Sequence, residues 1–237
     1  MEREKRTILL VDGSASMLFY IGMLLKRLEY EVTTAGSAED ALRMLEGPLP
    51  SIVLAETSLS GMNGTELLKR IKSSPRMKAV PVVMLTSRSD TALKEACERL
   101  GCSDFLCKPV EPEALYRRLQ AVSEAIPRAN IRIAASLKVI VGEEQLAGTV
   151  TEISEGGFFV RTPELRQKDE VLRVRIVLPL CEIPATAVVL YSFRATAGSS
   201  QEPGMGMKFI EISDADRREV GAFIKERLVG DIVPQSG

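Results

Sequence analysis

The chain has 237 residues, enough for two ordinary domains, and its 45% hydrophobic and 27% charged content is typical of a globular protein. Its formal net charge is −1, and basic and acidic side chains are nearly balanced in both halves, which disfavours a duplex DNA-binding domain. The sequence contains no histidine, which excludes Ser-His-Asp catalysis, histidine-ligated metals and phosphohistidine chemistry.

The first half alternates short apolar runs with amphipathic stretches. Continuous apolar runs at residues 8–11, 52–55 and 82–85 predict parallel strands that are buried on both faces. Weaker patterns predict strands at 31–34 and 104–106, and helices at 17–28, 38–45, 66–71 and 111–124. Five alternating strand–helix units predict an α/β doubly wound, five-stranded parallel sheet with helices on both faces.

Polar residues stand where the predicted strands end. Asp12 follows the first strand, Glu56 the third and Thr86 the fourth, and Lys108 comes after the fifth, immediately before Pro109. Because ligands bind at the carboxyl ends of the strands in doubly wound folds, we expect these side chains to form one site. Their order and spacing resemble the phosphoacceptor site of two-component receiver domains, which implies a flavodoxin-like fold for this half.

The resemblance implies a role for each residue, and the chain departs from the family at two positions. In the family, two consecutive acids hold magnesium, an aspartate accepts the phosphoryl group, and the threonine and lysine hold its oxygens. Here Gly13 follows Asp12, and Glu56 stands in place of the aspartate. Phe105 occupies the position of the family's aromatic switch, and the alternative is an ordinary core residue.

Both departures act against phosphorylation. Magnesium needs a dense set of oxygen ligands, so the missing carboxylate at Gly13 should lower metal affinity, and we expect no bound magnesium. The extra methylene of Glu56 moves its oxygens by about one bond length, and in-line phosphoryl transfer depends on positioning of that order. We therefore expect a degenerate site in which Glu56 pairs with Lys108 and imitates the phosphorylated state. The alternative is a vestigial polar cluster in an interaction scaffold.

After residue 127, strand-like segments follow one another without intervening helices. They lie at residues 137–141, 147–153, 158–161, 171–178, 187–191 and 205–212. Several alternate apolar and polar residues, as half-exposed antiparallel strands do. A final helix, capped by Ser213 or Asp214, should extend through Leu228. Six strands and one closing helix predict a small antiparallel β-barrel.

Two motifs distinguish the second half. Arg128 and Arg132 form an R-x-x-x-R element before the first strand, and Glu152, Ser154 and Gly157 belong to a turn with the sequence Glu-Ile-Ser-Glu-Gly-Gly. With the strand pattern and the late Gly-Met-Gly-Met-Lys-Phe segment, they resemble the PilZ domain, whose R-x-x-x-R arm and D/N-x-S-x-x-G turn bind cyclic di-GMP. The resemblance implies that these five residues bind cyclic di-GMP.

The residue types suit such a ligand. Arginine binds phosphate or guanine acceptors bidentately and stacks on a base, which lysine does less well. Ser154 and the glycine backbone at 156–157 would let the ligand approach the barrel closely. Glu152 departs from the family's Asp or Asn, and its longer side chain shifts the carboxylate. The alternative is that both arginines are solvated linker charges and the turn is an ordinary β-turn.

Cysteine spacing and hydropathy add two weaker expectations. The four cysteines, Cys97, Cys102, Cys107 and Cys181, lack metal-ligand spacing, and we expect them to be small buried apolar residues. No apolar run is long enough to cross a bilayer, and the first residues lack the pattern of a signal peptide, so we expect a cytoplasmic protein.

These features predict a receiver-like (pseudo-receiver) domain at residues 1–124, a linker and arginine arm at 125–132, and a PilZ-like barrel at 133–237. Because the arm is also the linker, ligand binding should reorient the domains. The expected function is that of a non-enzymatic bacterial signalling adaptor that binds cyclic di-GMP and acts on a signalling or motility protein. We expect no nucleic acid binding and no membrane insertion, and a homodimer is left open. The alternatives are a constitutive scaffold without nucleotide binding and a phosphorelay response regulator.

Overall fold

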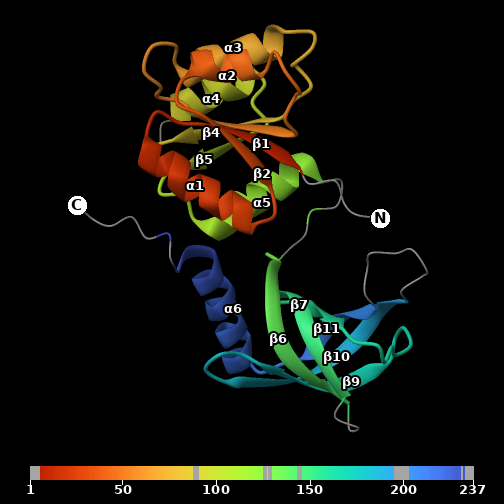
Figure 1. Ribbon diagram of the computed structural model, residues 1–237. Helices are drawn as coiled ribbons and strands as arrows, with labels where there is room; N and C mark the ends of the chain where they lie inside the picture. The colour runs from red at the N-terminus through yellow and green to blue at the C-terminus, as the bar shows by residue number, and fades with distance from the viewer. Residues whose placement is uncertain are drawn as a thin grey trace. The chain divides into compact units, whose positions relative to one another are not determined.

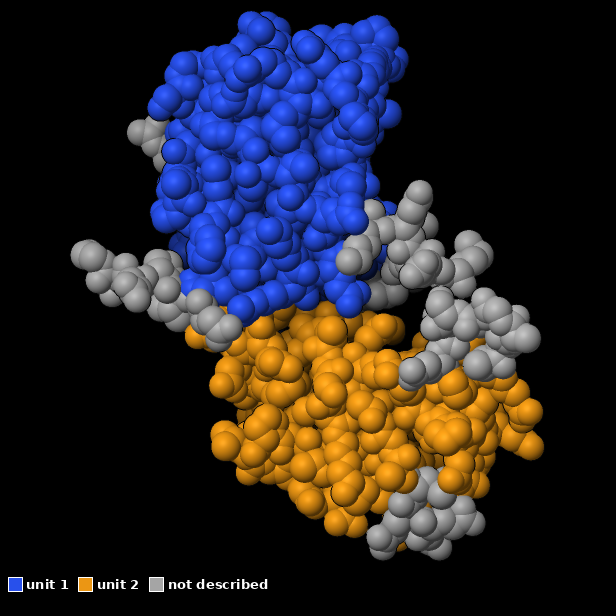
Figure 2. Space-filling model, in the orientation of Figure 1, with its two compact units in different colours: residues 1–129, 231–237 blue, residues 130–230 orange. Residues whose placement is uncertain are grey.

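The computed structural model describes most of the chain, namely residues 6–87, 91–124, 127, 130–142, 146–194, 203–230 and 232. The chain divides into two compact units, Met1–Ala129 with Asp231–Gly237, and Asn130–Gly230, which Figure 2 shows in different colours. Each unit is built on a β-sheet of its own.

The first unit is a five-stranded parallel sheet flanked by helices. Its elements in chain order are β1 (Thr7–Val11), α1 (Ala15–Arg27), β2 (Glu31–Ala35), α2 (Ala38–Met44), β3 (Ile52–Glu56), α3 (Gly64–Ser73), β4 (Val82–Thr86), α4 (Thr91–Arg99), β5 (Asp104–Cys107) and α5 (Pro112–Ser123). The strand order is β2-β1-β3-β4-β5, and helices cover both faces of the sheet (Figure 1). The doubly wound architecture predicted from the sequence is confirmed, and it brings the ends of β1, β3 and β4 side by side.

Burial on both faces holds the central strands. Every residue of β3 and β4 is buried, and so are the last four residues of β1. Fully burying an aliphatic side chain contributes about 1.5–3 kcal/mol, so these strands form a stable base for the polar residues at their ends. Helices α1, α2 and α3 begin at the N-cap side chains of Ser14, Ser37 and Asn63, each of which accepts a backbone N–H from the first turn.

The second unit is a closed barrel of six antiparallel strands with one helix. Its elements in chain order are β6 (Ile133–Val141), β7 (Leu146–Ser154), β8 (Gly157–Arg161), β9 (Val171–Val177), β10 (Glu182–Phe193), β11 (Gly204–Glu211) and α6 (Asp214–Val229). The strand order around the barrel is β10-β11-β8-β7-β6-β9 (Figure 1). Ser213 is the N-cap of α6 and accepts the backbone N–H of Asp216. The predicted barrel and its closing helix are confirmed.

Several elements differ in their bounds from the sequence expectation, and β6, for example, begins at Ile133, four residues before the predicted start. Strand β10 begins at Glu182, five residues before the predicted start. Proline is unfavourable inside a strand, so Pro184 hides this part of the strand in the sequence. In the barrel, Pro184 is accommodated opposite Arg175 of β9. Helix α4 was not located by periodicity, since Cys97 is its one fully buried residue and its apolar stripe is therefore thin.

Among the helices of the described ranges, none is both long and apolar enough to span a bilayer.

The cysteines differ from one another in exposure. Cys97 is buried, Cys102 and Cys181 are half-buried, and Cys107 is exposed. The expectation of four buried cysteines is therefore confirmed for Cys97, met only in part by Cys102 and Cys181, and wrong for Cys107, which ends the edge strand β5. Burial is the main cause that raises the pKa of the Cys97 thiol, and that of Cys102 to about 11, so both stay protonated at neutral pH.

Gly64 closes the loop between β3 and α3 against the strand end. A Cβ atom at this position would lie 2.0 Å from the carbonyl oxygen of Glu56 and 3.0 Å from Cα of Thr57. The backbone N–H of Gly64 also donates to the carbonyl of Thr57 at 3.0 Å. Any side chain here would force the loop away from Glu56.

We predict that Gly64→Ala lowers the free energy of unfolding of the first unit by about 1–3 kcal/mol, as overpacking does. Gly13→Ala is the matched control, because a Cβ there meets no atom within 4 Å and should change stability by less than about 0.5 kcal/mol. Urea denaturation of the full chain, followed by circular dichroism, measures both values. Equal effects of the two substitutions would show that the close approach at Gly64 does not matter.

Candidate functional site

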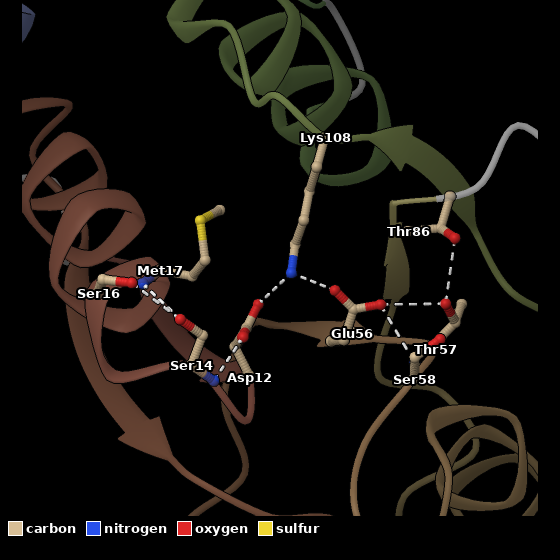
Figure 3. A network of polar contacts seen from close by, with 9 residues as sticks. All are labelled: Asp12, Ser14, Ser16, Met17, Glu56, Thr57, Ser58, Thr86 and Lys108. Carbon is tan, nitrogen blue, oxygen red and sulfur yellow. Dashed lines mark hydrogen bonds and ion pairs between the residues drawn. The ribbon is translucent and has the colours of Figure 1, made fainter. Parts of the chain in front are cut away.

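A buried ion cluster stands at the carboxyl edge of the parallel sheet. Asp12 follows β1, Glu56 ends β3 and Lys108 follows β5, and their side chains point toward one another (Figure 3). Lys108 Nζ lies 2.6 Å from Asp12 Oδ2 and forms a second ion pair with Glu56 Oε2. Asp12 and Glu56 are 2% and 4% exposed, so a single ammonium group faces two carboxylates away from water.

The cluster keeps Lys108 charged. Burial lowers the pKa of Lys108, but the hydrogen bonds and charges of Asp12 and Glu56 together outweigh burial and raise the pKa above its ordinary value. Asp12 is also oriented by the backbone N–H of Ser14, which donates to its Oδ1 at 2.9 Å. The cation is thus held from two sides by carboxylates that are themselves fixed.

Glu56 reaches Thr86 through an intermediate hydroxyl. The Thr57 hydroxyl donates to Glu56 Oε1 at 3.1 Å, and the backbone N–H of Ser58 donates to the same oxygen at 3.1 Å. The hydroxyls of Thr57 and Thr86 lie 3.2 Å apart. A hydroxyl carries one hydrogen, so Thr57 donates either to Glu56 or to Thr86, but not to both at once. Both oxygens of the Glu56 carboxylate are therefore occupied by protein groups.

Thr57 was not predicted from the sequence as part of this site. A hydroxyl residue that directly follows a carboxylate at a strand end could have indicated it. Phe105, the residue at the position of the family's aromatic switch, is half-buried and packs against the hydrophobic core of the first unit.

In the barrel, the arginine arm is described in part. Arg128 lies outside the described residues. Arg132 stands just before β6, and its Nη1 lies 4.0 Å from Glu152 Oε2 of β7, with both side chains about half exposed. In the ladder, Glu152 is paired with Ala134 on one side and Phe159 on the other. The arm therefore meets the outer surface of the barrel at Glu152.

The turn at residues 154–157, between β7 and β8, is held from three directions. The hydrogen bonds, donor first, are Ser154 Oγ to Gly157 O (3.0 Å), Phe209 N to Gly156 O (3.1 Å) and Arg217 Nη1 to Glu155 O (2.8 Å). The Ser154 hydroxyl thus donates its hydrogen within the turn and helps to fix the turn's conformation. Arg217, on α6, was not indicated by any sequence pattern.

The two glycines of the turn have different packing reasons. A Cβ at Gly157 would lie 2.2 Å from the carbonyl oxygen of Met207, so glycine lets β8 approach β11. A Cβ at Gly156 would lie 2.6 Å from Nδ2 of Asn130, which belongs to the R-x-x-x-R segment. Packing against the backbone of β11 therefore requires glycine at 157 independently of any ligand, whereas at 156 the neighbour is a side chain that can move aside.

Two aromatic rings continue the outer surface beyond Glu152. A Cβ at Gly204 would lie 2.5 Å from the ring of Phe159, and one at Gly206 would lie 2.4 Å from the ring of Tyr191. Each ring therefore covers a glycine of β11, and the ring centroids are 6.4 Å apart. This aromatic pair was missed from the sequence. Its signal is the alternation of glycine and methionine in β11, which leaves the outward positions without side chains.

Comparison with protein families identifies both units. The family model described as the response regulator receiver domain matches residues 8–120, and the PilZ domain model matches residues 124–226. The predicted combination of the two domains is confirmed.

Several curated proteins resemble the first unit. The two-component response regulators ORR6 and ORR5 of Oryza sativa subsp. japonica are 37% and 34% identical over 113 and 111 residues. Each alignment covers 46% of this chain, and they cover 66% of ORR6 and 83% of ORR5. The phosphate regulon transcriptional regulatory protein PhoB of Escherichia coli (strain K12) is 28% identical over 169 residues, covering 67% of this chain and 74% of PhoB. The chain therefore belongs to the response-regulator family, with a receiver domain followed by a PilZ domain.

Proposed function

We propose that the protein is a signalling adaptor whose PilZ domain binds cyclic di-GMP and whose receiver domain works without being phosphorylated. Receiver and PilZ domains are typically non-enzymatic signalling domains. The observation that carries the proposal is the half-exposed pair of Arg132 and Glu152 beside the prearranged turn at 154–157. Its ligand would be held by Arg128, Arg132, Glu152, Ser154 and Gly157.

The geometry around Arg132 allows a ligand to take the place of Glu152 as the partner of the guanidinium group. An exposed ion pair contributes only about 0–1 kcal/mol, so its loss costs little. A phosphate that takes up the guanidinium forms charge-assisted, bidentate hydrogen bonds, which are stronger than neutral ones. Glu152, once released, can accept from the N–H groups of guanine. The rings of Phe159 and Tyr191 offer faces on which a base can stack, worth about 1–3 kcal/mol per base.

The turn needs little ordering before it binds. Its three hydrogen bonds come from β7, β11 and α6, so its conformation is supported by three elements of the barrel. Rigid sites avoid the cost of immobilising loops on binding. Glu152, whose side chain is longer than the family's Asp or Asn, is then the residue that limits affinity.

The arm also provides a route from ligand to output. Helix α5 ends at Ser123 and β6 begins at Ile133, so the R-x-x-x-R segment lies within the connection between the two domains. Ordering that segment over a nucleotide restrains the connection and shifts the distribution of domain orientations. The output is a change in the surface that a protein partner meets.

The receiver site does not fit magnesium or phosphoryl transfer. Magnesium takes near-octahedral oxygen ligands with several waters, but Asp12 and Glu56 are both already paired with the ammonium group of Lys108. Gly13 adds no carboxylate. The second oxygen of Glu56 accepts from Thr57 and the backbone of Ser58, so neither oxygen is available for attack on a phosphoryl group.

Cyclic di-GMP should bind the purified full chain in a calorimetric titration. Arg128→Ala and Arg132→Ala should each weaken binding about tenfold or more, because each removes charge-assisted contacts. Glu152→Asp should preserve or improve affinity. Arg175→Ala, an exposed arginine of β9 paired with Glu182, is the matched control and should leave affinity unchanged.

Small-angle scattering with and without the nucleotide should show a change in domain arrangement, and Arg132→Ala should abolish it. Undetectable binding would reject the nucleotide site and favour the constitutive scaffold. Binding with an identical scattering profile would retain the site and reject the coupling through the arm.

Acetyl phosphate and magnesium should leave the intact mass of the protein unchanged, because Glu56 is already engaged on both oxygens. The combined variant Gly13→Asp/Glu56→Asp restores the family's acidic residues and is the positive control, which should gain the mass of one phosphoryl group. An adduct on the unaltered chain that maps to Glu56 would contradict the proposal and favour a phosphorelay response regulator.

Lys108→Met should lower the free energy of unfolding by about 3–5 kcal/mol, because it leaves two buried carboxylates without their cation. Glu56→Gln keeps the pair of Lys108 with Asp12 and should cost about 1 kcal/mol. The pKa of Lys108 is raised in the folded state, so its contribution is complete at neutral pH and is lost only as the pH rises through that raised value.

Urea denaturation at neutral pH measures both variants. The triple variant Asp12→Asn/Glu56→Gln/Lys108→Met should recover most of the loss, because it removes the buried charges together. If Lys108→Met costs no more than Glu56→Gln, the cluster is vestigial and its charges do not hold the site.

A further inference from the structure

A basic groove lies on the outer surface of the barrel, across β6, β7 and β8. It has a volume of about 560 Å³ and is lined by Ser136, Lys138, Thr149 and Arg161, among others. Its lining, among the described residues, contains two cationic side chains and no carboxylate. A hollow of this composition favours an anion.

The strand pairing explains how the two cations come together. Lys138 of β6 is paired with Thr149 of β7, and Thr149 is paired with Arg161 of β8. Their neighbours in the strands, Val139, Val150 and Val160, are buried in the barrel, so the row of three points outward. Adjacent strands are about 4.8 Å apart, which places Lys138 and Arg161 about 10 Å apart with the threonine hydroxyl between them.

Side chains as long as lysine and arginine can converge on one group at that separation. The guanidinium of Arg161 can bind a phosphate bidentately, the ammonium of Lys138 can act as a point charge, and the hydroxyls of Ser136 and Thr149 can donate. We propose that this groove is an anion site that binds a phosphate group.

The groove shares no lining residue with the candidate nucleotide site, although the two lie near each other on β7 and β8. Arg161 lies two residues beyond Phe159 in β8, about 7 Å along the strand, and Phe159 is the ladder partner of Glu152. The phosphate in the groove can therefore belong to a cyclic dinucleotide that is also held at Arg132. This first source of the phosphate depends on the proposed function. The second source is a separate phosphate anion.

Two titrations of the full, nitrogen-15-labelled chain separate these sources, one with cyclic di-GMP and one with inorganic pyrophosphate. Backbone amide shifts at Lys138, Thr149 and Arg161 report occupation of the groove without any mutation. Calorimetry then compares Lys138→Gln/Arg161→Gln with Lys168→Gln/Lys225→Gln, which removes two positive charges from exposed positions outside the groove. All four side chains are exposed, so both double variants should fold.

Amide shifts in the groove with cyclic di-GMP, together with an affinity loss of about tenfold in the groove variant and none in the control, would support a nucleotide phosphate. Shifts with pyrophosphate that the groove variant abolishes would support a separate anion, even if cyclic di-GMP fails to bind. If neither probe shifts these amides, or if both double variants weaken binding equally, the groove is not an anion site. This conclusion holds whether or not Arg132→Ala lowers the affinity for cyclic di-GMP.

Discussion

The interaction on which the receiver domain depends is the contact of one ammonium group with two buried carboxylates. Parallel strands end at the same edge of a sheet, so Asp12 and Glu56 are brought together whether or not their charges are compatible. Two carboxylates cannot remain buried side by side without compensation, and Lys108 supplies it from the end of β5.

The extra methylene in Glu56 makes this closed arrangement reachable. One oxygen extends to Lys108 while the other stays close enough to accept from Thr57 and Ser58 at its own strand end. Thr57 then links the carboxylate to the hydroxyl of Thr86 on the neighbouring strand. The result is a connected polar network across the ends of β1, β3, β4 and β5.

The barrel is organised differently, because its functional groups stand on an outer surface and are partly exposed. Closure of six strands places residues from distant parts of the sequence in rows across the sheet. One row carries Glu152, Phe159, Gly206 and Tyr191, and another carries Lys138, Thr149 and Arg161. The first offers a carboxylate and two rings, and the second offers two cations. The ion pair of Arg132 with Glu152, beside the first row, is half exposed and therefore weak.

Much of this protein was readable along the chain. Continuous apolar runs identified the buried parallel strands, and alternation identified the barrel strands. Asp12, Glu56 and Lys108 were recognisable because each stands directly after or at the end of such a strand, and Arg132 because it belongs to a five-residue motif. The sequence did not show which partners Thr57, Arg217, Lys138 and Arg161 meet, nor that two rings cover Gly204 and Gly206. Each depends on strand order and register, which bring together residues far apart in the sequence, and on bulges that shift the pairing by one residue. Local pattern therefore determined which elements form, whereas the closing of the sheet and barrel decided which side chains meet.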